Sequence, residues 1–87
     1  MSPDNLGPFY EWEDRENPPY SLGVAIRAWI DRLDQAPWQL PSIPIPEMTV
    51  EGEYQTRIAT VLGVDIFYQE HYSSRKIALT YLGTRPS

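Results

Sequence analysis

The sequence predicts an α+β fold, in which a three- to four-stranded antiparallel sheet has one main helix packed on one of its faces. Residues 54–85 contain three runs that alternate with the period of a strand and are rich in β-branched and aromatic residues. Residues 20–36 carry apolar side chains at helical spacing. Because a small sheet with one apolar face needs a cover, we expect the helix to supply it.

Short connections join the three runs, so sequential antiparallel pairing is expected. We expect the strands near residues 54–61, 64–71 and 76–82. Leu62 and Gly63 suit a tight turn between the first two, since glycine tolerates positive φ. The helix should pack against the sheet face that carries Ile58, Ile66 and Leu79.

The main helix is predicted over residues 20–36. Ser21 is the expected N-cap, and Pro37 ends the helix because a proline disfavours helical backbone in the residue before it. The apolar stripe consists of Leu22, Ile26, Trp29, Ile30 and Leu33.

Two proline-rich segments complete the 87-residue chain, which is predicted to form one small domain. Residues 1–19 are acidic and aromatic, and we expect an extended arm or an edge strand there, because proline cannot join a central ladder. Residues 37–53 are expected to form an ordered strap across the domain. Its apolar side chains, which we expect to be buried, are Trp38, Leu40, Ile43 and Ile45.

Composition narrows the function classes. The chain has no cysteine, which excludes disulfides and thiolate metal sites. No apolar run approaches the ~20 residues of a membrane span, and the N-terminus lacks a signal-peptide pattern, so we expect a cytoplasmic protein with no membrane partner. Residues 1–56 carry ten acidic against three basic residues, whereas residues 57–87 carry two against four. An anionic partner should therefore meet the sheet end.

The sequence contains few residues in patterns typical of catalysis or metal binding. His71 is the only histidine, and no metal-ligand spacing, phosphate loop or nucleophile motif is present, so we expect no metal and no cofactor. The other candidates are Arg57, Arg75, Arg85, Tyr68, Tyr72 and Tyr81. Arginine and tyrosine on a sheet can hold a phosphodiester and stack on a base. The alternative is that they pack the sheet and pair with Asp65 and Glu70.

A strand-like segment and a helical region, followed by GEYQTRIATVLGVDIFYQEHYSSRKIALTYLGTR, resemble the RelE/ParE superfamily of toxins from bacterial toxin–antitoxin modules. The resemblance covers residues 20–85 and is strongest at residues 54–60, in the G-x-x-I-F-Y-Q run at 63–69 and at 77–85. It implies helices packed on an antiparallel sheet and an antitoxin as partner. It also implies action either as a metal-free ribonuclease on mRNA at the ribosome or as an inhibitor of DNA gyrase.

The same resemblance implies which residues act. Arg57 matches a basic position of the first strand of the meander, and Arg85 matches the arginine after the last one. Tyr68 and Tyr81 complete the expected active or target-binding face. Asp65 stands where the family pattern has an arginine, so we expect reduced or absent ribonuclease activity, because a transition-state charge would lose its cationic partner.

The alternative is a non-catalytic protein-binding module, such as a small inhibitor or an antitoxin-like partner. It would use an acidic, aromatic face, since tryptophan anchors with a charged rim suit protein interfaces. The expected binding residues are Trp12, Glu13, Asp14, Trp38 and Arg75. The sequence leaves the target and the oligomeric state open.

Overall fold

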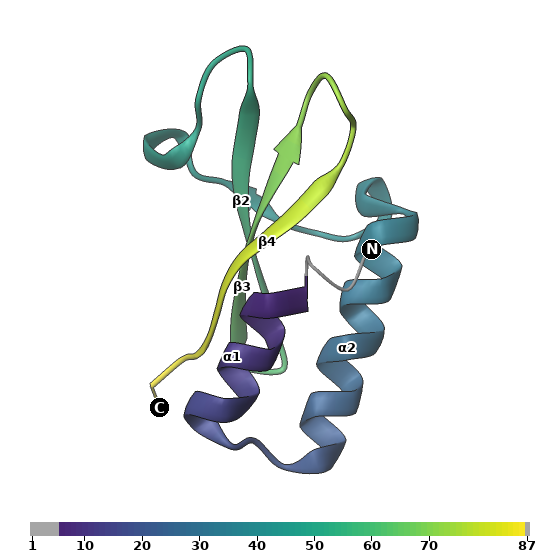
Figure 1. Cartoon of the computed structure of the whole chain (residues 1–87), viewed down its shortest axis with the longest axis vertical. Helices are drawn as coiled ribbons and strands as arrows, with labels where there is room; N and C mark the ends of the chain where they lie inside the picture. Colours follow the sequence, from purple (N-terminus) through teal and green to yellow (C-terminus); the bar gives the residue numbers. More distant parts are fainter. Residues whose placement is uncertain (1–5, 87) are drawn as a thin grey trace.

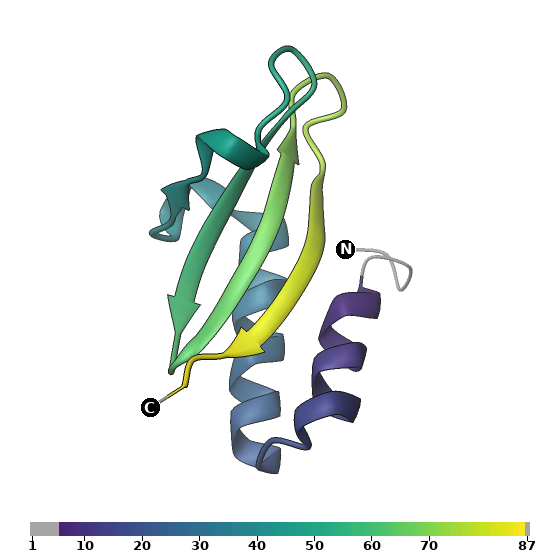
Figure 2. The ribbon, with the colours of Figure 1, turned by 90° about the vertical axis from the view of Figure 1, so that its left-hand side faces the viewer.

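The computed structural model describes residues 6–86 and confirms the α+β class. The elements are the helices α1 (Gly7–Glu16) and α2 (Tyr20–Gln35), the single 3-10 turns η2 (Pro37–Gln39) and η3 (Pro46–Met48), and the strands β1 (Ile43–Pro44), β2 (Tyr54–Val61), β3 (Val64–His71) and β4 (Ile77–Thr84). The two α-helices form an antiparallel hairpin that lies along one face of the sheet, and the other face carries only the short turn η3, near the start of β2 (Figures 1 and 2).

The sheet is antiparallel throughout, with the strand order β1-β2-β3-β4. The predicted meander is confirmed, and its last strand begins one residue later and ends two residues later than expected. A fourth strand comes from the strap, where Ile43 pairs with Ile58. The strap therefore protects part of the outer edge of β2, and its prolines keep that cover short.

The side chains of β2 that face the helices are one residue away from those predicted. Ala59 is opposite Ile66, which is opposite Leu82, and all three are buried beneath the helices. Ile58 instead is opposite Phe67 on the open face, so the expected helix-facing set of Ile58 with Ile66 is wrong. A shift of one residue turns every side chain of a strand to the other face. The small Ala59 gives the helices room where an isoleucine would crowd them.

The N-terminal segment is a helix, not the arm or edge strand that the prolines suggested; residues 1–5 lie outside the described residues. Pro8 lies in the first turn of α1, where a missing N–H costs nothing. Asn17 ends the helix with φ of 45°, a left-handed cap that asparagine tolerates. Phe9 and Trp12 lie one turn apart and are both buried, so aromatic side chains that looked like interface anchors are core residues.

Helix α1 is attached to the outer edge of β4. The Arg15 guanidinium donates to the carbonyl oxygen of Leu82, and the Thr84 backbone N–H donates to the Glu16 carboxylate at 3.2 Å. The Trp12 indole N–H donates to the Thr84 hydroxyl at 3.2 Å. These side chains occupy backbone groups to which a further strand would bind, so α1 covers this end of the sheet edge.

Helix α2 begins at Tyr20 directly after Pro19 and has no side-chain cap, so the prediction of Ser21 as N-cap is wrong. Its apolar stripe is buried as expected except for Leu22, which is partly buried, and Trp29 lies edge-on to Tyr68 of β3 with ring centroids 6.5 Å apart. No helix in residues 6–86 combines the length and the apolar character needed to cross a membrane.

The strap is ordered but buries less than predicted. Of its apolar side chains only Leu40 is buried, whereas Trp38 is 78% exposed and Ile43 is 68% exposed. Turn η3 instead packs on the end of β2, where the buried Thr56 hydroxyl donates to the Met48 carbonyl. The strap therefore leaves four large apolar side chains in contact with solvent, namely Trp38, Ile43, Met48 and Val50.

Candidate functional site

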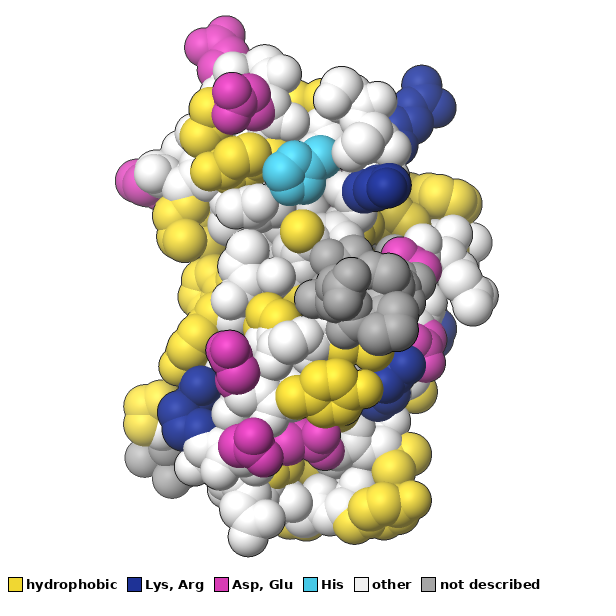
Figure 3. Space-filling view, viewed as in Figure 1, with side chains coloured by type: hydrophobic (Ala, Val, Ile, Leu, Met, Phe, Trp, Pro, Cys, Tyr) yellow, Lys and Arg dark blue, Asp and Glu magenta, His cyan; other side chains and the backbone are white. Residues whose placement is uncertain are grey.

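Two of the predicted binding residues, Trp38 and Arg75, lie on the same surface cleft. The cleft has a volume of about 370 Å³ and lies between η2 and the hairpin that joins β3 to β4. Its lining residues are Pro37, Trp38, Glu70, His71, Tyr72, Arg75, Lys76 and Ile77. Figure 3 shows basic side chains and the histidine gathered over this upper part of the molecule. The fold thus joins residues from two segments that are far apart in the sequence.

One wall of the cleft is Trp38. Pro37 starts the single turn η2, and this turn holds the Trp38 side chain outward with 78% of it exposed. Across the cleft, Tyr72 is 50% exposed. Two large aromatic side chains that face the same solvent-filled space provide apolar area that folding did not bury, which is the usual composition of an interface anchor.

The opposite wall depends on an unusual backbone. Arg75 has φ of 55°, a left-handed conformation in which glycine or asparagine is the usual residue. The adjoining hairpin is closed by a hydrogen bond from the His71 N–H to the Lys76 carbonyl oxygen at 3.0 Å. A non-glycine residue in this region costs about 1 kcal/mol or more. Arginine at this position is therefore better explained by what its side chain does than by the turn.

The cleft is locally basic on an acidic protein. Within residues 6–86, neither Arg75 nor Lys76 forms an ion pair, and both are exposed. The carboxylate in the lining, Glu70, is already 3.8 Å from the Arg57 guanidinium. His71 Nε2 bonds to the Gln69 side-chain oxygen at 3.1 Å, and its ring lies against Tyr54. Two unpaired cations beside two aromatic rings define the chemistry of the site.

The expected catalytic set does not assemble. Tyr68 is fully buried against Trp29, and its hydroxyl has no hydrogen-bond partner among the described residues. The alternation of β3 turns Tyr68 to the same face as Val64 and Ile66, beneath the helices. The prediction that Tyr68 contacts a target is therefore corrected: it is a core residue, and any ligand outside the protein is beyond its reach.

Arg57 has a structural partner for most of its donors. Its guanidinium donates to the Ser42 hydroxyl at 2.5 Å and to the Ser42 carbonyl oxygen at 3.0 Å. It also donates to the Gln55 side chain at 3.0 Å. Arg57 thus fastens the strap to β2, and its side chain is only 22% exposed.

Arg85 and Tyr81 are accessible, but each is held by a different partner. Arg85 donates to the Asp65 carboxylate at 2.8 Å, and the same carboxylate accepts from the Thr60 hydroxyl at 2.7 Å. Tyr81 is half exposed, with the Arg15 guanidinium carbon 5.0 Å from its ring centroid. The four residues expected to act together therefore each have a different environment.

The acidic, aromatic face that was expected to bind a partner differs from the prediction. Trp12 is completely buried, so it cannot anchor a partner. Asp14 is exposed, and Glu13 borders a shallow groove of about 250 Å³ between the helices together with Phe9 and Arg27. The surface of the helical hairpin carries the expected acidic residues but not the expected tryptophan. This face therefore supports binding less well than the cleft does.

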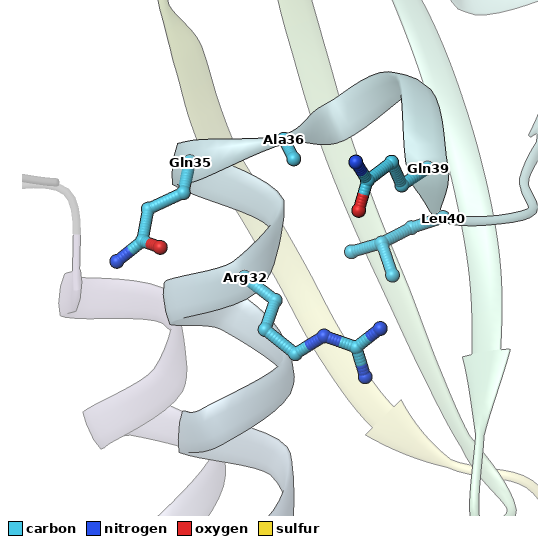
Figure 4. A pocket seen from close by; sticks show the side chains of 5 residues that line it. All are labelled: Arg32, Gln35, Ala36, Gln39 and Leu40. Atoms are coloured by element: carbon cyan, nitrogen blue, oxygen red, sulfur yellow. The ribbon is translucent and has the colours of Figure 1, made fainter.

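A second hollow lies at the C-terminal end of α2. It has a volume of about 210 Å³ and is lined by Arg32, Gln35, Ala36, Gln39 and Leu40. Figure 4 shows the Arg32 side chain directed toward Gln39 and Leu40. Within the described residues, no three histidine, aspartate or glutamate side chains come together as a metal site would require. This hollow has one charged side chain and no exposed aromatic ring, so it offers less than the Trp38 cleft.

The cleft contains residues that the sequence reasoning did not assign to binding, namely His71, Lys76 and Ile77, whereas Tyr72 was a candidate for nucleic-acid contact. The signal was present in the basic turn that follows His71, but that turn was interpreted as an ordinary connection. Compared with known proteins, the chain matches no family model, no curated protein and no solved structure. The resemblance to RelE/ParE toxins therefore stays a prediction.

Proposed function

We propose that this protein acts by binding another protein, and that the cleft between Trp38 and Arg75 receives an acidic segment of that partner with one apolar anchor residue. The observation that carries the proposal is the strained Arg75 backbone, which places an unpaired cation beside two exposed aromatic rings. Carboxylates of the segment would pair with Arg75 and Lys76, while its apolar side chain would pack between Trp38 and Tyr72.

A protein segment fits this site better than a nucleic acid. The chain has one lysine and a net charge of −5, and each phosphate contact needs its own cation. The cleft offers two unpaired cations and also contains Glu70, which would repel a continuous phosphate backbone. A peptide needs only one or two carboxylates and can place them away from Glu70.

A random peptide library, displayed on phage and selected on the purified protein, tests the proposal. We expect selected peptides to combine aspartate or glutamate with an aromatic residue or leucine. Their binding should fall at least tenfold with Trp38→Ala and with Arg75→Glu. The matched control is Tyr20→Ala, which removes an aromatic side chain that is 88% exposed on α2. Selected peptides that bind Trp38→Ala as well as the wild type would contradict the proposal, as would preferential binding of a uridine oligonucleotide.

Tryptophan fluorescence provides an independent measurement. Trp12 is fully buried and Trp29 is 9% exposed, so Trp38 is the tryptophan most accessible to an added quencher. A selected peptide should protect the protein from quenching by acrylamide. No protection at a saturating peptide concentration would place the binding site elsewhere.

We also propose a second function, a toxin-like protein of a bacterial toxin–antitoxin module that acts in the cytoplasm. The observation that favours it is the helical hairpin on an antiparallel meander, which is the plan that the RelE/ParE resemblance implies. In this proposal the antitoxin supplies the acidic segment, and the target is the ribosome with its mRNA or DNA gyrase. Ribonuclease activity should be weak, because the residues that would carry it are dispersed.

Expression in a bacterial host separates the two functions. A toxin should arrest growth, and Arg85→Ala should relieve the arrest without unfolding the protein, because Arg85 is an exposed residue. Harmless expression, together with peptide binding at the Trp38 cleft, would leave only the protein-binding function.

A further inference from the structure

The open face of the sheet carries an apolar row that crosses all four strands. Ile43 is opposite Ile58, Ile58 is opposite Phe67, and Phe67 is opposite Tyr81. Residues directly opposite each other in an antiparallel sheet share a face, so these four side chains form one line. Ile43 is 68% exposed, Tyr81 is half exposed, and Ile58 and Phe67 are partly exposed. Figure 2 looks onto this face: α1 and α2 lie behind the sheet, and the short turn η3 covers the open face only near the start of β2, at Thr56.

One end of the row is held in place. The rings of Phe67 and Tyr81 meet edge to face with centroids 5.9 Å apart. The Tyr81 ring lies over Gly83, where an added Cβ would be only 2.8 Å from a ring carbon. With Arg15 on its other side, Tyr81 has little freedom to turn away. An ordered aromatic surface loses little entropy when it binds a partner.

The charge of this face indicates the kind of partner. Two ion pairs lie at this face: Asp65 with Arg85 at 2.8 Å, and Arg15, beside Tyr81, with Glu16 at 3.5 Å. The other polar side chains of the face include Thr56, Thr60, Gln69, His71 and Thr80, and the exposed Glu47 of η3 borders the face beside Gln69 and Thr80. The Ile43–Ile58–Phe67–Tyr81 row itself is uncharged and the ion pairs beside it are neutralised, so the row offers little to a strongly acidic or basic partner. It is also the place where two chains of net charge −5 can meet with the least repulsion.

We propose that two copies of this chain associate through their open faces, and that the Ile43–Ile58–Phe67–Tyr81 row of one copy packs against the same row of the other. Two sheets packed face to face form a sandwich, and a two-fold axis through the row makes the surface self-complementary. The face measures roughly 20 by 25 Å, which is about 500 Å² per copy and lies at the small end of specific interfaces. We therefore expect a dimer whose population depends on protein concentration.

This association is independent of the proposed binding cleft. Trp38, Tyr72 and Arg75 lie at the end of the sheet, beyond the row, so a dimer would keep two open clefts. Failure of one proposal leaves the other intact, because the two depend on different residues.

Sedimentation velocity over a concentration series tests the proposal. The wild type should shift from the 10.1 kDa mass of one chain toward twice that mass as the concentration rises. Ile43→Lys and Phe67→Glu should each keep the protein monomeric over the whole series. Ile43 lies on a two-residue strand and is mostly exposed, so its variant tests the interface even if Phe67→Glu fails to fold.

The control is Val24→Lys, which adds the same charge at a half-exposed position of α2 and should leave the dimer intact. A mixture of Phe67→Glu with Phe67→Lys should recover a dimer, because opposite charges then meet at the two-fold axis. Three results would overturn the proposal: a wild type that stays monomeric, a dimer that survives Ile43→Lys, or a dimer that Val24→Lys disrupts equally.

Discussion

The hydroxyl of Tyr68 lies in the core with no hydrogen-bond partner among the described residues. The ring is well placed, because it fills the space between β3 and Trp29. The oxygen has been removed from water without receiving a partner, which is unfavourable by about 1–3 kcal/mol. The sequence could not show this, since a tyrosine in an alternating strand has equal reason to face solvent.

Tyr68→Phe should raise the free energy of unfolding by about 1 kcal/mol, because it removes the unpaired hydroxyl and keeps the ring. Urea denaturation followed by circular dichroism measures the change. The half-exposed Tyr72 provides the control, and Tyr72→Phe should leave the stability unchanged. A Tyr68→Phe variant that is less stable than the wild type would show that the hydroxyl has a partner.

Arg75 illustrates a residue that is unfavourable for the fold. Arg75→Gly should stabilise the protein by up to about 1 kcal/mol, because glycine adopts the left-handed conformation without steric cost. The same change should weaken peptide binding at the cleft. Thermal unfolding and peptide titration of one variant measure both effects. Lys76→Ala, one residue later, should weaken binding without any gain in stability, and equal peptide affinity for wild type and Arg75→Gly would remove Arg75 from the site.

At the scale of elements, the sequence predicted the sheet better than the helices. Residues 54–85 have strong strand patterns, and the short connections left little choice of topology. Helix α1 was missed because the four prolines in residues 1–19 were interpreted as evidence for an extended arm or an edge strand. Pro8 and Asn17 in fact fit the start and the end of a helix, and Pro18 and Pro19 follow it. The position of each proline along the chain, rather than the number of prolines, is what allows the helix to form.

The attachment of α1 to β4 should depend on pH through Glu16. Hydrogen bonds from the Thr84 side chain and backbone, with help from Arg15, lower the pKa of Glu16 from its ordinary value of 4.5. The carboxylate therefore contributes stability above that value, and this contribution is lost as the pH falls through the lower folded-state pKa. Wild type should lose more stability than Glu16→Gln between about pH 6 and pH 3.

Melting temperatures at the two pH values measure this difference. Glu11 is the matched control, since it is an exposed carboxylate on the same helix, and Glu11→Gln should follow the wild type. Identical acid sensitivity in all three proteins would show that Glu16 does not hold α1 to the sheet.

The strap depends on Arg57 in a comparable way. Arg57→Ala removes three hydrogen bonds to Ser42 and Gln55, so it should lower the free energy of unfolding by about 1–3 kcal/mol. Arg85→Ala breaks an exposed pair with Asp65 and should cost less than about 1 kcal/mol. Guanidinium chloride denaturation of both variants shows which of them loses more free energy of unfolding. Equal losses would mean that Arg57 is no more structural than Arg85.

For the molecule as a whole, the class of fold was predictable and the site was predictable only in part. Trp38 and Arg75 were chosen from their residue types, but their proximity depends on where η2 ends and how the last hairpin bends. The face of β2 was assigned one residue out of register because isoleucine at position 58 suggested burial. Tertiary packing decided both outcomes, and a local pattern carries no information about the element that will lie against it.

The attachment of α1 to β4 also has a consequence for synthesis. The ribosome makes Arg15 and Glu16 long before Leu82 and Thr84, the groups that they bind. At about 5–20 residues per second, roughly 3 to 14 seconds separate the two ends of this contact. During that interval Phe9 and Trp12 lack the strand that shelters them, so the nascent chain presents an aromatic helix to chaperones. The first helix can complete its folding only after the last strand has left the ribosome.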